Sequence, residues 1–140
     1  MLEQPLDDYE DQFRACVAQS VLITQAFAHA MIARRGGRFI GINTECAAQC
    51  FPSQSAYVAG KRGMEGVLRC LAREIGPHGI TVNQVAPGWT ISEKDRSNGT
   101  EKQPGYDSGV PMRHFLVSEQ ARFITGAFLP VCGGNVMPGI

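Results

Sequence analysis

The stretch QSAYVAGKRGMEGVLRCLAREIGPHGITVNQVAPGWTIS, residues 54–92, has a helix pattern directly before a strand pattern. From residue 53 to about 75, apolar side chains recur on one helical stripe, formed by Met64, Val67, Leu68, Leu71 and Ile75. The Gly-Pro pair at 76–77 ends this helix. The run ITVNQVAP, residues 80–87, is rich in β-branched residues and predicts a strand that ends in a Pro-Gly turn.

Further elements flank this unit. Residues 8–35 contain no Gly or Pro, begin with acidic side chains and end in two arginines before Gly36, which predicts a long helix. The apolar run FIGI at 39–42 predicts a buried strand. A short helix at 117–125 and a third strand at 126–132 follow. This order predicts an α/β fold with a parallel sheet of about three strands.

The expected layers are incomplete. The two long helices should lie on the same side of the sheet, which leaves the other face uncovered. We expect residues 1–140 to form a single domain. Within it, residues 92–112 have little apolar periodicity and many Ser, Asn, Gly and Pro residues, so we expect a lid-like loop there.

Composition excludes several classes of partner. The 13 basic and 13 acidic side chains leave a net charge of zero, so we expect no nucleic acid partner. No apolar run approaches the roughly 20 residues that span a bilayer. The start MLEQPLDDYEDQ is acidic, unlike a signal peptide. We therefore expect a cytoplasmic protein without a membrane partner.

The five cysteines form no CxxC pair and have no histidine at zinc-ligand spacing, so we expect no metal site. Free thiols are the expectation for all of them, namely Cys16, Cys46, Cys50, Cys70 and Cys132. A redox pair between Cys46 and Cys50 is the alternative.

Tyr57 and Lys61 carry the clearest chemical signal. They are four residues apart at the start of a helix, so their side chains share one face. A nearby ammonium favours the phenolate form of a tyrosine, which helps the phenol to exchange a proton with a substrate hydroxyl or carbonyl. The spacing alone also occurs as an ordinary solvated pair.

Residues 54–92 as a whole closely resemble the active-site helix and following strand of the short-chain dehydrogenase/reductase family. GRFIGIN upstream and RFITGAFLPVCGG downstream resemble the strands on either side, so the likeness covers nearly the whole chain. The resemblance implies a partial Rossmann-like, doubly wound sheet without its N-terminal βαβ units. It also implies hydride transfer between NAD or NADP and an alcohol or ketone substrate.

The resemblance assigns roles to individual residues. Tyr57 would be the acid/base, and Lys61 would lower its pKa and bind the nicotinamide ribose. Thr44, thirteen positions before Tyr57, would hold the substrate oxygen, although alignment on Asn43 would instead give Cys46 that position. The family's nicotinamide-binding loop corresponds to Pro87, Gly88, Thr90 and Ser92.

Three departures from the family pattern bear on activity. The glycine-rich TGxxxGxG turn that binds the pyrophosphate is absent. Cys16 stands where the family has an asparagine of its proton relay. VPMRH runs directly into FLVSEQ, where relatives have about a dozen more helical residues. The alternative to an active oxidoreductase is therefore an inactive fragment that only oligomerises through its two long helices, or one that needs a second chain for cofactor binding.

Overall fold

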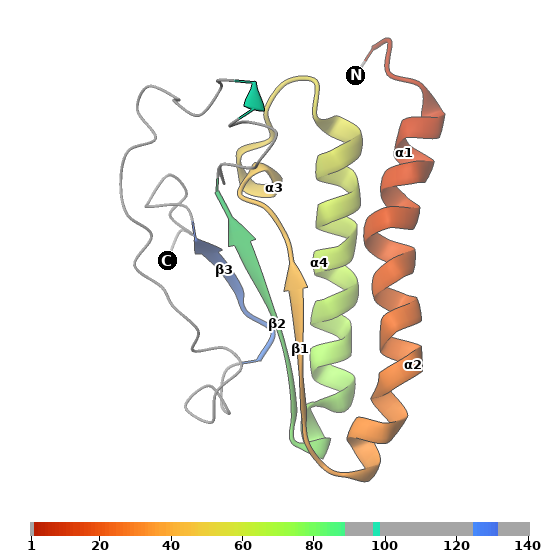
Figure 1. The fold of residues 1–140 in the computed structure, drawn as a ribbon, viewed down its shortest axis with the longest axis vertical. Coiled ribbons are helices and arrows are strands. Elements are labelled where there is room, and N and C mark those ends of the chain that lie inside the picture. Colours follow the sequence, from red (N-terminus) through yellow and green to blue (C-terminus); the bar gives the residue numbers. More distant parts are fainter. Residues whose placement is uncertain (1, 89–96, 99–124, 132–140) are drawn as a thin grey trace.

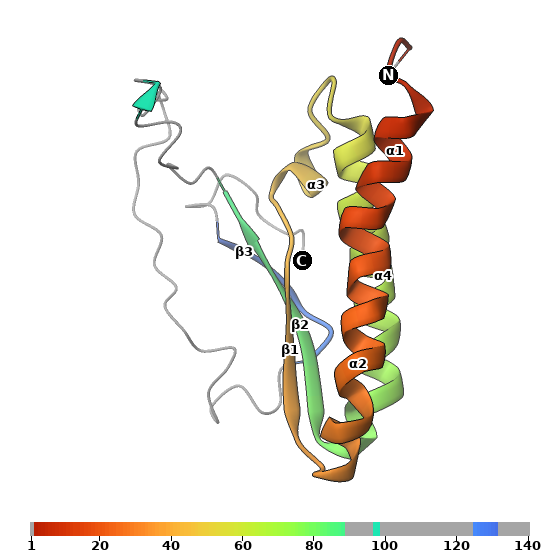
Figure 2. The same cartoon turned by 45° about the vertical axis from the view of Figure 1, so that its right-hand side comes forward.

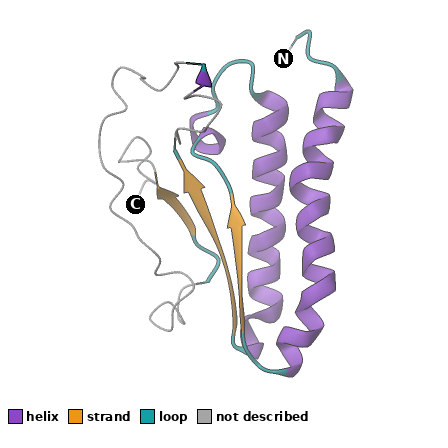
Figure 3. Ribbon diagram, viewed as in Figure 1, coloured by secondary structure: helices purple, strands orange, loops and turns teal. Residues whose placement is uncertain are grey.

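The computed structural model describes residues 2–88, 97–98 and 125–131, which form a parallel sheet covered by helices (Figure 1 and Figure 3). The sheet order is β1-β2-β3, and both neighbouring pairs are parallel. The strands are β1 (Gly37–Ile42), β2 (Ile80–Pro87) and β3 (Phe128–Val131). The predicted α/β class and the three parallel strands are confirmed.

Two long helical segments lie on one side of this sheet, as Figure 2 shows most directly. The first comprises α1 (Leu6–Gln12), a π-helical segment η1 (Phe13–Ala18) and α2 (Gln19–Ala33), and the second is α4 (Ser55–Ile75). In the described part of the chain no helix covers the other face. The prediction that both helices share one side of the sheet is therefore confirmed.

The core lies between α4 and the sheet. Its buried side chains come from the apolar stripe of α4 and from the inward positions of β1 and β2, chiefly Phe39, Met64, Leu68, Leu71, Ile75, Ile80 and Val82. Gly41 allows this packing, because a Cβ there would lie 2.4 Å from the Leu68 side chain. The sequence stripe thus identified the buried face of the helix.

The first helix approaches α4 closely through two glycines. A Cβ on Gly60 would lie 2.8 Å from the carbonyl oxygen of Gln12, and one on Gly63 would lie 2.8 Å from the Val17 side chain. The π-helical segment lies at this contact, whereas the sequence predicted one regular helix over residues 8–35. Apolar periodicity does not distinguish a π-turn from an α-turn over so few residues.

Two short elements were not predicted. A single helical turn, α3 (Cys46–Gln49), follows β1, and a 3-10 turn, η2 (Gly76–His78), joins α4 to β2. Cys50 ends α3 with φ 54°, in the left-handed region that is uncommon for a side chain larger than hydrogen. A four-residue helix is too short to give a periodic signal in the sequence.

Other predictions fall wholly or mostly outside the described residues. These are the lid-like loop at 92–112 and the short helix at 117–125.

By length and composition the helical segment Leu6–Ala33 could cross a membrane, although the sequence predicted no such run. Core helices of soluble proteins and N-terminal signal sequences meet the same criterion, so one such helix is weak evidence, and this segment lies along α4.

Candidate active site

Tyr57 and Lys61 lie on consecutive turns at the start of α4, and Lys61 contacts the carboxyl end of β1. The Lys61 ammonium nitrogen is 5.9 Å from the centroid of the Tyr57 ring, so the predicted juxtaposition of the two side chains is present. Both residues are partly exposed. Tyr57 borders an open hollow of about 330 Å³ between α1 and α4, and Lys61 borders another of about 280 Å³ beside β1. Both groups are therefore accessible from solvent.

The Lys61 ammonium is held by the end of β1. It donates a hydrogen bond of 2.8 Å to the carbonyl oxygen of Ile42, the last residue of the strand. In open α/β sheets, ligands bind in the crevice outside the carboxyl ends of the strands. The cation thus stands at the edge of the sheet where a ligand site is expected.

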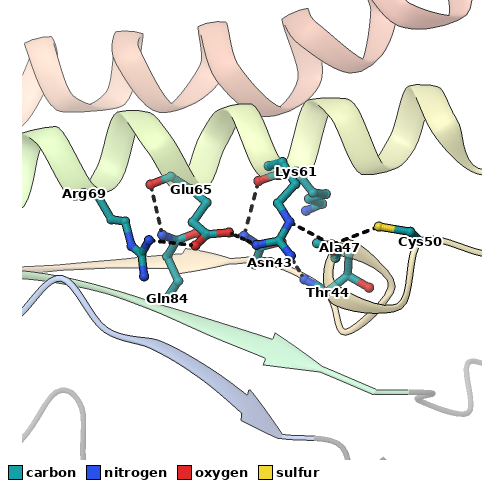
Figure 4. A network of polar contacts seen from close by, with 9 residues as sticks. Asn43, Thr44, Ala47, Cys50, Lys61, Glu65, Arg69 and Gln84 are labelled. Atoms are coloured by element: carbon teal, nitrogen blue, oxygen red, sulfur yellow. Dashed lines mark hydrogen bonds and ion pairs between the residues drawn. The ribbon is translucent and has the colours of Figure 1, made fainter. Parts of the chain in front are cut away.

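Asn43 joins three elements at this edge (Figure 4). Its amide nitrogen donates to the side-chain oxygen of Gln84 on β2 at 2.8 Å and to the main-chain oxygen of Lys61 on α4 at 3.3 Å. Its side-chain oxygen accepts the backbone N–H of Thr44 at 2.9 Å. Both Asn43 and Gln84 are almost completely buried. They fix the end of β1 relative to the helix that carries Tyr57 and Lys61.

Thr44 and Cys46 occupy different environments. Thr44 is 8% exposed, and its hydroxyl oxygen accepts the backbone N–H of Cys46 at 3.3 Å. Cys46 begins α3 and is partly exposed. The threonine hydroxyl can still donate its own proton, because that bond uses only an oxygen lone pair. Both residues lie at the carboxyl end of β1, and the choice between them stays a prediction.

The Pro-Gly turn lies next to this segment. The backbone N–H of Glu45 donates to the carbonyl oxygen of Pro87 at 3.1 Å, which joins the loop after β1 to the end of β2. Pro87 and Gly88 are thereby placed near Thr44. Thr90 and Ser92, predicted to bind the nicotinamide, lie outside the described residues.

Arg62 and Glu65 form a polar pair that the sequence analysis missed. Glu65 is buried, and its two carboxylate oxygens bind Arg62 at 2.8 Å and Arg69 at 3.4 Å. Arg62 also donates from Nε to the carbonyl oxygen of Ala47 at 2.8 Å. Glu65 is a charged residue directly beside Met64 of the apolar stripe. A charged residue at that position could have predicted a buried polar contact from the sequence.

Cys16 lies in the π-helical segment and is buried. Its thiol contacts the side-chain oxygen of Gln12 at 4.0 Å, and its carbonyl oxygen accepts the Ser20 hydroxyl at 2.7 Å. A thiol is a weak hydrogen-bond donor.

Over residues 2–88, 97–98 and 125–131 no cluster of His, Cys, Asp and Glu could hold a metal ion, and the four cysteines described there are free thiols.

A family model described as enoyl-(acyl carrier protein) reductase matches residues 1–135 of this chain. The chain belongs to this family of short-chain dehydrogenases/reductases, as the motifs around Tyr57 indicated.

Individual relatives agree with this assignment. The chain is 32% identical over 143 residues to the 3-oxoacyl-[acyl-carrier-protein] reductase FabG of Pseudomonas aeruginosa, covering 94% of this chain and 58% of the relative. It is 34% identical over 127 residues to the corresponding reductase MabA of Mycobacterium avium, covering 82% of this chain and 50% of the relative. The chain thus spans between half and three fifths of the length of these relatives.

Solved structures of dehydrogenases share the fold of this chain. The acetoin dehydrogenase of Enterobacter cloacae superposes with a TM-score of 0.78 at 25% identity, covering 99% of this chain and 62% of that structure. The acetoin dehydrogenase YohF of Salmonella typhimurium has a TM-score of 0.77 at 30% identity, covering 96% and 58%. The partial Rossmann-like fold is therefore confirmed.

Proposed function

We propose that this chain provides the catalytic part of an NAD(P)-dependent oxidoreductase that interconverts ketones and secondary alcohols. The observation that carries the proposal is the Tyr57–Lys61 pair, accessible to solvent and held at the carboxyl end of β1. The reductase and dehydrogenase names of the relatives support the reaction class.

Each residue has one chemical task in this reaction. In the reducing direction, the Tyr57 phenol donates its proton to the carbonyl oxygen, and in the oxidising direction the phenolate removes the hydroxyl proton. Lys61, held by the carbonyl oxygen of Ile42, binds the nicotinamide ribose. Thr44 donates a hydrogen bond to the same substrate oxygen and so orients it toward Tyr57. NAD or NADP, when bound, accepts or supplies the hydride.

The residues of this chain fit only the nicotinamide side of the cofactor. Lys61 retains two ammonium N–H donors besides the one that binds Ile42, and these suit a ribose hydroxyl. Pro87 and Gly88 lie at the adjacent strand end, where the Pro87 carbonyl oxygen accepts the N–H of Glu45. The sequence has no TGxxxGxG turn for the pyrophosphate. Tight binding of the dinucleotide is therefore not expected from these 140 residues by themselves.

We propose further that a second polypeptide segment completes the cofactor site. Among the described residues β1 pairs only with β2, so it is an edge strand of the described sheet. Ile42 at this edge is 60% exposed. Parallel sheets are normally larger than three strands and buried on both faces. A strand from another segment that bears the glycine-rich turn would complete both the sheet and the site.

The first helix gives a basis for self-association. Several large apolar side chains on it are exposed, namely Leu6, Phe13, Leu22, Ile23 and Phe27. An open groove of about 500 Å³ beside them runs between this helix and α4, with Phe13 and Val17 in its wall. Exposed apolar patches of this kind mark interaction surfaces. We propose a homo-oligomer formed through these helices, in the cytoplasm. An inactive fragment that retains only this association is the alternative function.

The test is a complementation experiment. The purified chain is titrated with NADH and NADPH, alone and together with the N-terminal segment of the Pseudomonas aeruginosa relative that this chain does not match. Turnover is followed by NADPH absorbance with a 3-oxoacyl thioester and with acetoin as substrates. Turnover that requires both segments supports the proposed enzyme and the second-segment requirement. Absence of both binding and turnover in the mixture, with both segments folded, supports the inactive fragment.

A further inference from the structure

The turn after β1 is attached to α4 by one arginine. Arg62 donates from Nε to the carbonyl oxygen of Ala47, in the middle of α3, at 2.8 Å. Its Nη1 group simultaneously binds a carboxylate oxygen of Glu65 at 2.8 Å. The guanidinium thus connects a buried acid on the helix with the main chain of the turn.

The turn lies next to the candidate catalytic residues. The turn begins two residues after Thr44 and contains Cys46. These are the two residues considered for binding the substrate oxygen. Arg62 directly follows Lys61, so the same turn of α4 holds both the ammonium and the guanidinium. Ala47 is fully buried, and besides Arg62 its carbonyl oxygen contacts the Cys50 thiol, a weak donor, at 3.7 Å.

Arg69 serves as a natural comparison. It pairs with the other carboxylate oxygen of Glu65 at 3.4 Å, one helical turn further along α4. Within the described part of the chain Arg69 makes no hydrogen bond or ion pair with α3, whereas Arg62 binds Ala47. Both arginines are exposed over about half of their side chains or more. They differ chiefly in the bond to the turn.

We propose that Arg62 is a positioning residue that fixes the turn at 46–50, and with it Thr44, relative to Tyr57 and Lys61. Glu65 orients the guanidinium, because it holds Nη1 while Nε is directed at Ala47. The bidentate geometry of arginine suits this double contact, which a lysine ammonium cannot reproduce in the same plane. The inference rests on the proposed function for its catalytic consequence, but the position of the turn can be measured without turnover.

Thiol modification measures that position directly. In a Cys50→Ala background, which removes the second donor to the Ala47 carbonyl oxygen, Cys46 is the remaining thiol on the turn. The exposed Cys70 on α4 is an internal reference in the same molecule. The full chain is treated with iodoacetamide under native conditions. The initial modification rates of Cys46 and Cys70 are obtained by mass spectrometry of their peptides. The ratio of the two rates reports opening of the turn and cancels differences in reagent and concentration.

In Arg62→Met the ratio of the Cys46 rate to the Cys70 rate should rise about fivefold. A change of this size is expected when one hydrogen bond from a half-exposed charged donor is lost. Glu65→Gln should raise it in the same direction, and the double variant should add little beyond Arg62→Met. Arg69→Met should leave the Cys46 rate itself within about twofold of the parent, and that rate is the control here because Arg69 directly precedes Cys70. Arg62→Lys should lie between the parent and Arg62→Met. Circular dichroism and thermal unfolding confirm that each variant is folded.

Equal ratios in Arg62→Met and the parent would overturn the proposal, as would a rise of the Cys46 rate in Arg69→Met equal to that in Arg62→Met. In a complemented, active enzyme, Arg62→Met should also lower kcat/KM without changing the Kd for NADH. The failure of the proposed function is seen separately, since it would leave turnover absent or independent of Tyr57 while the thiol ratios still respond to Arg62.

Discussion

The Lys61 ammonium lies 5.9 Å from the centroid of the Tyr57 ring while it donates a 2.8 Å hydrogen bond to Ile42. The charge is therefore held near the phenol by the main chain of β1, even though the side chain is partly exposed. This arrangement leaves the phenol accessible to a substrate. It also separates the tasks of the two residues, so that substitutions can test them individually.

Replacement of Tyr57 by phenylalanine should remove turnover in the complemented enzyme. The ring and its contact with Lys61 remain, and only the proton-transfer group is lost, so we expect a fall of about 100-fold or more. Tyr9→Phe is the matched control, because Tyr9 is also a partly buried tyrosine, and within the described residues its hydroxyl bonds to the Ser55 hydroxyl at 2.6 Å. That control should stay within about threefold of the parent. Similar losses in both variants would contradict the assigned role.

Replacement of Lys61 by methionine should separate catalysis from stability. Methionine keeps a long apolar stem but has no charge and cannot donate to Ile42. We expect turnover to fall about 100-fold, while the free energy of unfolding in urea changes by no more than about 1 kcal/mol because the bond is exposed. Arg73→Met removes an exposed cation further along α4 and should affect neither quantity. A loss of stability that accounts for the whole loss of turnover would refute the catalytic role.

The sequence predicted the parts of the fold that follow from local pattern. The apolar stripe around Met64 identified α4 and its buried face, and the four-residue spacing placed Tyr57 beside Lys61. The partner of Arg62 could not be predicted, because Ala47 is fifteen residues away and contributes only a main-chain oxygen. Main-chain acceptors leave no signature in the identity of a residue.

Substitutions at Thr44 and Cys46 should decide which residue holds the substrate oxygen. Thr44→Val removes the hydroxyl while keeping the shape, and we expect kcat/KM to fall about tenfold or more, as for loss of a hydrogen bond to the reacting atom. Cys46→Ala should change kcat/KM by no more than about threefold. Steady-state kinetics of the complemented enzyme measures both. The reverse order of effects would assign the position to Cys46, as alignment on Asn43 suggests.

Two glycines on α4 should respond in opposite directions to replacement by alanine. A Cβ on Gly60 would lie 2.8 Å from the Gln12 carbonyl oxygen, so the first helix must move, and we expect a loss of about 1–3 kcal/mol in the free energy of unfolding. A Cβ on Gly66 would meet nothing within 4 Å. Gly66→Ala should therefore gain about 0.5–1 kcal/mol, the difference in helix propensity. Urea denaturation of both variants makes the comparison, and an equal effect would show that the close helix contact does not form in solution.

A charge on the exposed face of the first helix should weaken self-association. Phe27 is 57% exposed although it is large and apolar, which suits a contact with a second copy better than a free surface. In Phe27→Glu, the buried carboxylate would cost several kcal/mol at such a contact, so sedimentation velocity should show a shift from oligomer to monomer. Gln25→Glu adds the same charge to an exposed residue of α2 without removing an apolar side chain, and should keep the parent distribution. If the parent chain sediments as a monomer at all concentrations, the first helix does not mediate self-association.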